Sequence, residues 1–215
     1  MKNIEKRNEL LAKKVITAFE KRNFNAFYAA SKDEAFKQIL NLIDKTDVIG
    51  WGGSVTVDEL KIKEYLEENG YTVINRDKAK SKEEKRELAL KCLSADVFLM
   101  SSNAITEDGE LVNIDGQGNR IAALCFGPKK VIVVAGMNKI VKALDDAIQR
   151  ARNYAAPVNA QRVASHLGIQ TPCVTAGACY DCKSTTSICS NILTTRLSFP
   201  QGRINVILVN DYLGY

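Results

Sequence analysis

The stretch Val48-Ile-Gly-Trp-Gly-Gly-Ser-Val-Thr-Val-Asp-Glu-Leu60 decides which fold the chain can adopt. It begins as an apolar run typical of a buried strand, passes through three glycines and two hydroxyl residues, and ends with helical spacing. Glycines let a backbone approach a ligand closely, and the first turn of a helix leaves N–H groups unpaired. The sequence therefore predicts a strand, a tight turn and a helix, with an anion bound at the turn.

The groups expected to hold this anion are backbone and hydroxyl groups of the turn, together with one amide that follows a later strand. They belong to Gly50, Gly52, Gly53, Ser54, Thr56 and Asn138. The turn is not the dinucleotide fingerprint, because Val55 stands in place of its third glycine, and no Gly-Lys-Ser/Thr follows to make a P-loop. A Gly-rich turn without a ligand is the alternative interpretation.

Short apolar strands alternate with helical patterns along most of the chain. This alternation predicts an α/β fold in which helices cover both faces of a parallel sheet, and ligands then lie beyond the carboxyl ends of the strands. The expected helices are 3–23, 31–43, 57–69, 81–93, 121–126, 140–154 and 160–167, and the expected strands are 24–30, 48–50, 71–75, 96–100, 130–135 and 204–209.

The alternation breaks after residue 101. Segment 105–115 has two alternating stretches around a central glycine, which predicts an inserted β-hairpin. Its acidic residues Glu107, Asp108 and Asp115 are candidate catalytic carboxylates, although such residues are also common in turns. Lys139 is a further catalytic candidate, because it follows the buried strand 130–135 and would place an ammonium group at the ligand-facing edge of the sheet. A surface lysine is the alternative there.

Length and composition indicate one domain over residues 1–215, because 215 residues of which 46% are hydrophobic can bury a full core. The net charge of +5 does not indicate nucleic-acid binding, since acidic residues lie among the basic ones, as in 78–91. No stretch reaches the ~18 apolar residues of a membrane span, and the first residues lack the apolar core of a signal peptide. We therefore expect a cytoplasmic protein with neither a nucleic-acid nor a membrane partner.

A cysteine-rich loop, residues 171–191, has neither helical nor strand periodicity. Its cysteines have the spacing C-x5-C-x2-C-x6-C and are Cys173, Cys179, Cys182 and Cys189. In a reducing compartment such a cluster indicates metal ligands or redox thiols. Four thiolates suit a four-iron, four-sulfur (4Fe-4S) cluster or, as the alternative, zinc, and four reduced thiols are the remaining interpretation. His166 is the only histidine, and its helical context favours a partly buried packing role over catalysis.

Several motifs in order along the chain resemble the LUD domain family of lactate-utilisation proteins. The motifs are 50–56, 106–116 with 118–120, 126–129, 136–141 and 156–159, and the resemblance extends from about residue 10 to residue 215. It implies a fold like that of the sugar-phosphate isomerases and coenzyme A transferases, a Rossmann-like parallel sheet with an inserted smaller β-element. In those relatives the Gly-Ser/Thr turn holds a phosphate or an acyl carrier, and by position that turn is 52–56 here.

The same resemblance implies a role in the oxidation of lactate, or another 2-hydroxy acid, to pyruvate by an iron–sulfur complex. The implied partners are a small anionic metabolite and an iron–sulfur oxidoreductase subunit, and we expect a homo-oligomer. A transferase or isomerase for phosphorylated or coenzyme A-linked substrates is one alternative, and a non-catalytic regulatory binding module is another. The cysteine-rich loop is not part of the core family pattern, although it resembles a variant seen in anaerobes.

Overall fold

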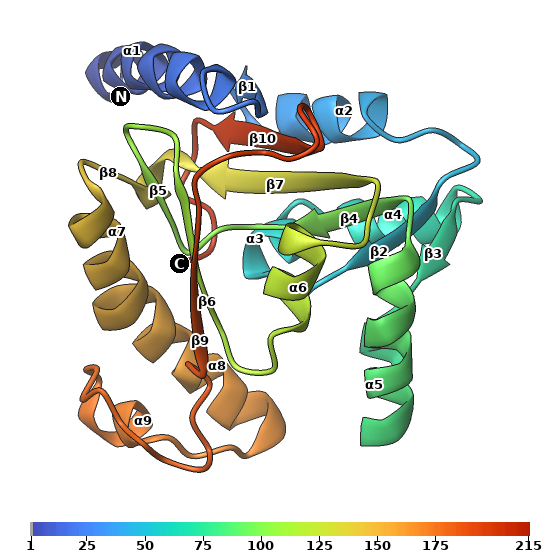
Figure 1. The fold of residues 1–215 in the computed structure, drawn as a ribbon, viewed down its shortest axis with the longest axis vertical. Coiled ribbons are helices and arrows are strands. Elements are labelled where there is room, and N and C mark those ends of the chain that lie inside the picture. Colours follow the sequence, from blue (N-terminus) through green and yellow to red (C-terminus); the bar gives the residue numbers. More distant parts are fainter. Residues whose placement is uncertain (1) are drawn as a thin grey trace.

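Two sheets form the body of the molecule in the computed structural model, which describes residues 2–215 (Figure 1). The larger sheet has six parallel strands in the order β1-β10-β7-β4-β2-β3, and the smaller has four in the order β8-β5-β6-β9. The strands of the large sheet are β1 (Asn25–Ala29), β2 (Val48–Trp51), β3 (Thr72–Ile74), β4 (Val97–Met100), β7 (Lys130–Gly136) and β10 (Ile204–Val209). The Rossmann-like parallel sheet that the sequence predicts is thus confirmed.

Helices cover both faces of the large sheet, because its central strands are apolar on both sides. Along β7, Val131 and Val133 face a core shared with α1 (Lys2–Glu20), whereas Ile132 and Val134 face a core shared with helices of the other face. Those helices are α2 (Lys32–Asn41), α3 (Val55–Glu59) and α4 (Ile62–Glu68). Such two-sided burial is what a parallel sheet requires. Two further helices, α5 (Lys82–Lys91) and α6 (Asn119–Cys125), precede β4 and β7.

A capping box lies at the start of the second helix. Ser31 Oγ accepts a hydrogen bond from Glu34 N at 3.2 Å, and Glu34 Oε2 accepts one from Ala30 N at 2.8 Å. These bonds satisfy N–H groups that the first turn of α2 would otherwise leave unpaired. The second helix therefore starts where the sequence predicts.

The small sheet contains the predicted hairpin, which is β5 (Ala104–Thr106) paired antiparallel with β6 (Leu111–Asp115). Two strands that the sequence analysis did not predict complete this sheet. β8 (Ile140–Val141) pairs with β5, and β9 (Asn191–Thr195) pairs with β6. The hairpin thus lies between β8 and β9, which both come later in the chain.

The prediction of a helix over 140–154 is wrong at its start, where β8 forms instead. The helix α7 (Leu144–Arg150) follows and runs through a π-helical turn, 151–155, into α8 (Ala156–Leu167). The gap expected between helices 140–154 and 160–167 is absent, because the wider π-helical turn before Pro157 accommodates a residue without an N–H group. Residues 144–167 therefore form one continuous helical rod.

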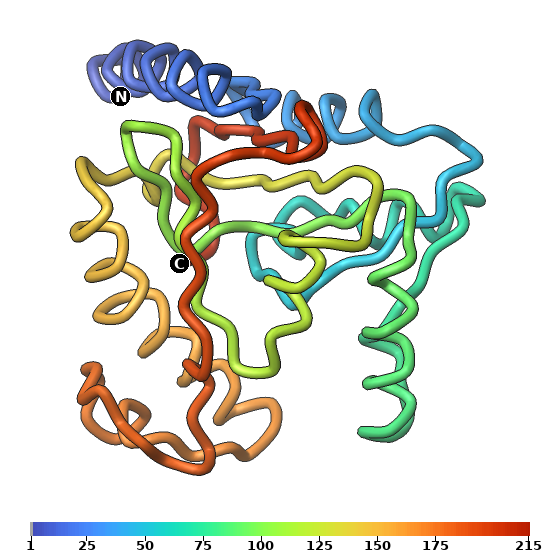
Figure 2. The backbone as a smooth tube through the Cα atoms, viewed as in Figure 1, coloured from blue at the N-terminus to red at the C-terminus, as the bar shows by residue number. Residues whose placement is uncertain are grey.

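The cysteine-rich loop lies at one end of the molecule, below α8 and away from the large sheet (Figure 2). It contains one short helix, α9 (Pro172–Ala176), and otherwise little regular structure before β9 begins. No helix within residues 2–215 is long and apolar enough to cross a membrane.

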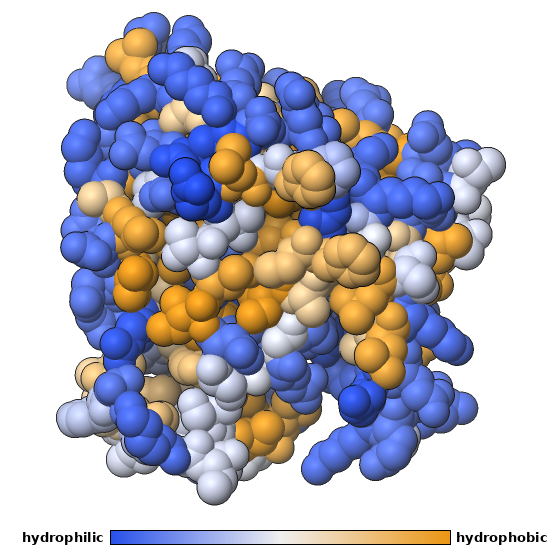
Figure 3. Space-filling model, viewed as in Figure 1, coloured by the Kyte–Doolittle hydropathy of each residue, from blue (hydrophilic) through white to orange (hydrophobic). Residues whose placement is uncertain are grey.

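One face of the molecule carries a band of apolar residues across its middle, whereas its rim is mainly hydrophilic (Figure 3). Large apolar side chains that are exposed include Phe126 and Phe199, with 85% and 87% of their surface accessible. Exposed apolar surface of this kind is common at protein interfaces. The homo-oligomer expected from the sequence stays a prediction.

Candidate functional site

A buried lysine lies at the carboxyl end of β7. Lys139 is only 3% exposed and ends the short turn Met137–Lys139, which connects β7 of the large sheet to β8 of the small sheet. Its Nζ donates hydrogen bonds to Thr56 Oγ1 at 2.9 Å and to Ser101 Oγ at 3.0 Å. Thr56 follows β2 and Ser101 follows β4, so three adjacent strands of the sheet bring these side chains together. We call Lys139, Thr56 and Ser101 the lysine centre.

The electrostatic surroundings of Lys139 disfavour its charge. Burial, together with the positive charges of Arg150 and Arg120, lowers the pKa of Lys139 to about 7, although the carboxylate of Glu59 acts in the opposite direction. Within residues 2–215 no carboxylate forms an ion pair with this lysine. A substantial fraction of Lys139 is therefore an unprotonated amine near neutral pH, which makes it a candidate base or nucleophile.

Arg120 forms hydrogen bonds that position Ser101 and its neighbours in the lysine centre. Its Nη1 donates to Ser101 O at 2.9 Å and to Asn113 Oδ1 at 2.5 Å, and its Nη2 donates to Asn103 Oδ1 at 3.2 Å. Asp115 forms an ion pair with Arg120 Nε at 3.7 Å. Because the guanidinium bonds both to the end of β4 and to β6, it fixes the two sheets relative to each other.

Arg150 is the second cation near Lys139. Its Nε donates to Asn138 O at 3.2 Å, its Nη1 donates to Asn103 O, and its guanidinium lies 5.2 Å from the ring of Tyr154. Its Nη2 has no hydrogen-bond partner in the described part of the chain. Burial lowers the pKa of Arg150, and the cation is thus half-buried with one donor group still free.

Two of the three glycines at the end of β2 and in the turn after it allow close packing within the protein. A Cβ atom at Gly50 would lie 2.8 Å from Cys92 Sγ, and one at Gly52 would lie 3.0 Å from Arg120 Cγ. Gly53 differs, because no atom lies within 4 Å of the position its Cβ would take. Of these three glycines, only Gly53 faces open space.

Ser54 and Asn138, which the sequence also assigns to the anion site, have partners within the chain. Ser54 Oγ accepts a hydrogen bond from Val57 N at 3.3 Å and caps α3. Asn138 Oδ1 accepts from Leu213 N at 3.2 Å, and its Nδ2 donates to Leu213 O at 3.5 Å. Of the polar side chains predicted for the anion site, it is therefore that of Thr56 that contacts Lys139.

The segment 211–215, which we call the C-terminal strap, lies over the lysine centre. Thr56 Oγ1 donates to Leu213 O at 3.4 Å. A Cβ atom at Gly214 would lie 2.6 Å from Thr56 Oγ1 and 3.5 Å from Lys139 Nζ. Gly214 has a φ of +53°, a conformation that favours glycine. The strap closes the lysine centre to solvent, so a ligand reaches Lys139 only when the strap is displaced.

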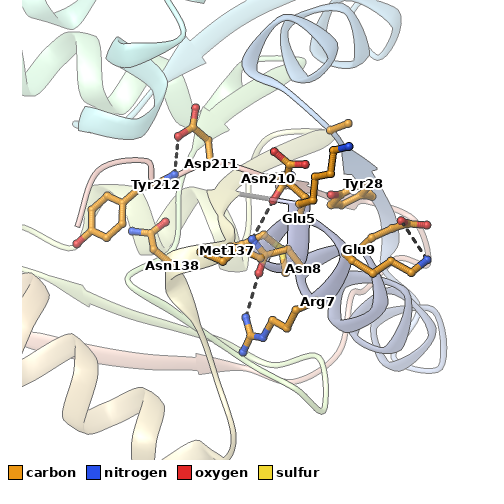
Figure 4. A pocket seen from close by; sticks show the side chains of 14 residues that line it. Glu5, Arg7, Asn8, Glu9, Tyr28, Met137, Asn138, Asn210, Asp211 and Tyr212 are labelled. Atoms are coloured by element: carbon orange, nitrogen blue, oxygen red, sulfur yellow. Dashed lines mark hydrogen bonds and ion pairs between the residues drawn. The ribbon is translucent and has the colours of Figure 1, made fainter.

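A cavity of about 890 Å³ lies on the other side of the strap (Figure 4). Its walls are the first half of α1, the ends of β1 and β10, and the turn after β7, and Asn8 Nδ2 donates to Asn210 Oδ1 at 2.8 Å across it. Figure 4 shows Asn138 and Tyr212 on the side opposite α1. Tyr212 lines this cavity and Gly214 covers Lys139, so the strap lies between the cavity and the lysine centre.

The acidic candidates have partners other than Lys139. Glu107 forms ion pairs with Lys14 and with Lys142, the latter at 2.9 Å, and its hydrogen bonds to both ammonium groups lower its pKa. Asp108 lies at the tip of the hairpin and accepts a hydrogen bond through its backbone oxygen. Asp115 is linked to the lysine centre only through Arg120, as described above. The structure thus brings Lys139, but none of these carboxylates, to the centre.

The four cysteines of the loop lie near one another. Burial and, to a smaller extent, the other three cysteines raise the pKa of Cys189 to about 11, because nearby negative charge disfavours another thiolate. Even so, no three His, Cys, Asp or Glu side chains within residues 2–215 have an arrangement that could hold a metal ion. In this placement the thiols do not form a metal-binding set, and we derive no chemical step through a metal.

His166 is exposed and not partly buried, so the packing role that the sequence favours for it is wrong. His166 lies on the solvent-facing side of α8, and its Nδ1 lies 2.8 Å from Arg162 O. Sequence reasoning also missed Arg150, whose position on a helix gave no signal. Ser101 directly follows β4, and its place after a predicted strand is the sequence signal that puts it at the ligand-facing edge of the sheet.

Comparisons with known proteins agree with this fold. A family model described as "LUD domain" matches residues 12–209. A crystal structure of a DUF162 family protein from Deinococcus radiodurans is similar, with a TM-score of 0.52, 15% identity, and coverage of 95% of this chain and 98% of that one. The structure of eIF2B delta from Chaetomium thermophilum has a TM-score of 0.35, 17% identity and coverage of 66% and 57%, too low for any argument. No curated protein matches the chain.

Proposed function

Because the chain belongs to the LUD domain family, which is associated with lactate utilisation, we propose that its lysine centre binds a small 2-hydroxy or 2-oxo acid such as lactate or pyruvate. The proposal concerns binding of the acid at Lys139. Oxidation of the acid by an iron–sulfur partner subunit, and a metal at the four cysteines, stay predictions.

A single observation carries the proposal. Lys139 is buried with hydroxyl partners, and within residues 2–215 no carboxylate lies within ion-pair distance of its Nζ; the carboxylate of Glu59, which accepts a hydrogen bond from Gly214 N, acts on it only from farther away. Burying an ammonium group without a counter-ion is costly, and proteins normally avoid it by pairing or by loss of the proton. A carboxylate ligand supplies the missing charge and restores a favourable environment for the protonated lysine.

The groups around Lys139 suit an acid that carries a second oxygen next to its carboxylate. The two cations, Lys139 and Arg150, attract the carboxylate, and the hydroxyl groups of Thr56 and Ser101 can bond to the oxygen on the second carbon. Gly214 packs directly against these groups, so a ligand needs the strap to move, and a small acid requires the smallest movement. Acetate or propionate lacks the second oxygen and should bind more weakly.

Thermal unfolding of the full chain tests the proposal with lactate, pyruvate, propionate and inorganic phosphate. We expect saturable stabilisation by lactate and pyruvate, a smaller effect of propionate, and loss of all these effects in Lys139→Met. Lys142→Met is the matched control, because this lysine lies three positions further on and its side chain is 72% exposed.

Two outcomes would contradict the proposal. The first is equal stabilisation of wild type and Lys139→Met by the acids, which would place their binding elsewhere. The second is stabilisation by phosphate with none by lactate or pyruvate, which would support a phosphorylated substrate and so the transferase or isomerase alternative.

A further inference from the structure

We infer that Lys139 forms an imine with the carbonyl carbon of a 2-oxo acid bound in the lysine centre. This inference rests on the proposed function and deepens it, because it makes Lys139 a catalytic residue and 2-oxo acids its substrate class. Lactate, which has no carbonyl group on its second carbon, would bind without reacting.

The geometry around the amine suits attack on a carbonyl group. A lysine that attacks a carbonyl group must be free of carboxylates that hold it as an ammonium ion, and it must be held in one position. Lys139 meets both conditions, since its Nζ has two hydroxyl partners at 2.9 and 3.0 Å and lies at a junction of two sheets. Lys63 does not meet the first, because it pairs with Asp58 at 2.6 Å and Asp77 at 3.0 Å.

The protonation state of Lys139 near neutral pH also favours attack on a carbonyl group. Burial and the charges of Arg150 and Arg120 bring the pKa of Lys139 to about 7, so that about half of it is uncharged at that pH. An ordinary lysine is uncharged only to about one part in a thousand at pH 7. Neighbouring positive charge and an apolar setting are established ways of activating a lysine for imine formation.

The reaction balances without an oxidant or a reductant. The Nζ lone pair forms a bond to the carbonyl carbon while the carbonyl π electrons move to oxygen, which takes up a proton. The resulting carbinolamine then loses its hydroxyl group with one further proton as water, and the C=N bond forms. Two hydrogens of the amine and the carbonyl oxygen leave together as that water.

The neighbours of Lys139 have defined parts in this step. The hydroxyl groups of Thr56 and Ser101 already bond to Nζ, and they are placed to pass protons between the amine and the carbonyl oxygen. Arg150, whose Nη2 has no partner within residues 2–215 and whose charge acts on Lys139, would attract the carboxylate of the acid. The C-terminal strap must first be displaced, because Gly214 lies over the amine.

Borohydride trapping of the full chain tests the inference. The protein is incubated with pyruvate or lactate at pH 7, reduced with cyanoborohydride, digested, and mapped by mass spectrometry. We expect a reduced pyruvate adduct on Lys139 with at least about tenfold higher occupancy than on Lys63 or Lys142, because few of the ordinary lysines are uncharged. We expect none with lactate, and none at this position in Lys139→Arg.

The outcomes separate the inference from the proposed function. Stabilisation by pyruvate without an adduct on Lys139 would overturn imine formation and leave acid binding intact. An adduct spread evenly over exposed lysines would overturn it as well, since that reflects ordinary amine chemistry. If neither acid stabilises the protein and no adduct forms, both ideas are wrong. Because the adduct is located in the wild-type chain, this result does not depend on the folding of a variant.

Discussion

Lys63 and Lys139 are both buried lysines, but their surroundings are opposite. Lys63 on α4 pairs with two carboxylates, those of Asp58 and Asp77, and lies 5.4 Å from the ring of Trp51. Lys139 at the end of β7 has two hydroxyl partners instead, and the charges of Arg150 and Arg120 disfavour its protonated form more than the more distant carboxylate of Glu59 favours it. On the side of the large sheet where ligands of such folds bind, one lysine thus has ion-pair partners and the other has none within residues 2–215.

This difference shows how one residue type serves structure in one place and chemistry in another. Two carboxylates form ion pairs with Lys63, and they make it a link between α4 and the turn that follows β3. Lys139 joins strand ends without a counter-ion, so its charge is adjustable and its partner can be a ligand. The following predictions test whether the two lysines differ in this way.

The largest expected effect is a pH dependence that belongs to Lys139 alone. Its pKa is near 10.5 in an unfolded chain and about 7 in the folded protein. Between these values the unfolded state binds more protons, so the free energy of unfolding rises with pH. We expect wild type to gain about 2 kcal/mol relative to Lys139→Met between pH 7 and pH 9.

Urea unfolding of both proteins at pH 7, 8 and 9 measures this difference. Lys63→Met serves as the control, and its difference from wild type should not rise with pH in the same range. A constant difference between wild type and Lys139→Met would mean that Lys139 remains charged in the folded protein, against our interpretation.

A second effect concerns Lys63, the buried lysine that has two ion-pair partners. Lys63→Met should destabilise the protein by roughly 1–2 kcal/mol, because it leaves Asp77 without its cation while the Trp51 Nε1 hydrogen bond to Asp77, 2.9 Å long, remains. The estimate is moderate since both carboxylates are partly exposed and screened by water. Lys63→Met should also leave lactate binding unchanged.

Lys78→Met is the matched control in chemical unfolding, since this lysine is 71% exposed and pairs with Glu67 at the surface. Its expected cost is below about 0.5 kcal/mol. Equal stability of Lys63→Met and Lys78→Met would show that burial and two carboxylates make no difference to Lys63.

A smaller effect is expected where the strap covers Lys139. Gly214→Ala should lower the free energy of unfolding by about 1 kcal/mol, because φ is +53° and the added Cβ would lie 2.6 Å from Thr56 Oγ1. The displaced strap should also expose Lys139, so that an amine-modifying reagent labels it faster. Peptide mapping after labelling measures that rate.

Gly53→Ala is the control for the strap, since nothing lies within 4 Å of its Cβ position and its φ is not positive. Its stability should change by less than about 1 kcal/mol, and labelling of Lys139 should stay slow. Unchanged labelling in Gly214→Ala would show that the strap does not control access to the centre.

The smallest expected effect lies in the cysteine-rich loop. In protein freed of metal, Cys179→Ala should change the free energy of unfolding by less than about 0.5 kcal/mol, because the loop is partly exposed and has few regular hydrogen bonds. Iron and zinc analysis after anaerobic purification measures whether the predicted 4Fe-4S cluster or zinc is bound. Bound metal that is lost in Cys179→Ala would confirm that prediction, whereas metal-free wild type would refute it.

Much of the fold follows from local patterns in the sequence. The apolar runs 130–135 and 204–209 and the glycines after residue 49 predict buried strands and a strand–turn–helix unit, and the structure contains both. The hairpin was predictable because its turn residues lie between two alternating stretches. Lys139 was a candidate because the sequence shows that it comes shortly after a predicted strand.

The rest depends on contacts between distant residues, which local patterns do not report. β9 was missed because Asn191–Thr195 becomes a strand only by pairing with β6. The strap was missed because its role arises from a contact between Gly214 and Thr56, far apart in the chain. The lowered pKa of Lys139 likewise requires burial by several segments, so sequence could suggest its position but not its chemistry.

The turn Met137–Lys139 has one further consequence, because it is the direct passage from β7 of one sheet to β8 of the other. Movement of the small sheet would shift the amine relative to Thr56, which stays with the large sheet. β9 attaches the cysteine-rich loop to that same small sheet. Any event in the loop that tilts the small sheet would therefore alter acid affinity, and by thermodynamic reciprocity the acid would alter that event by an equal factor.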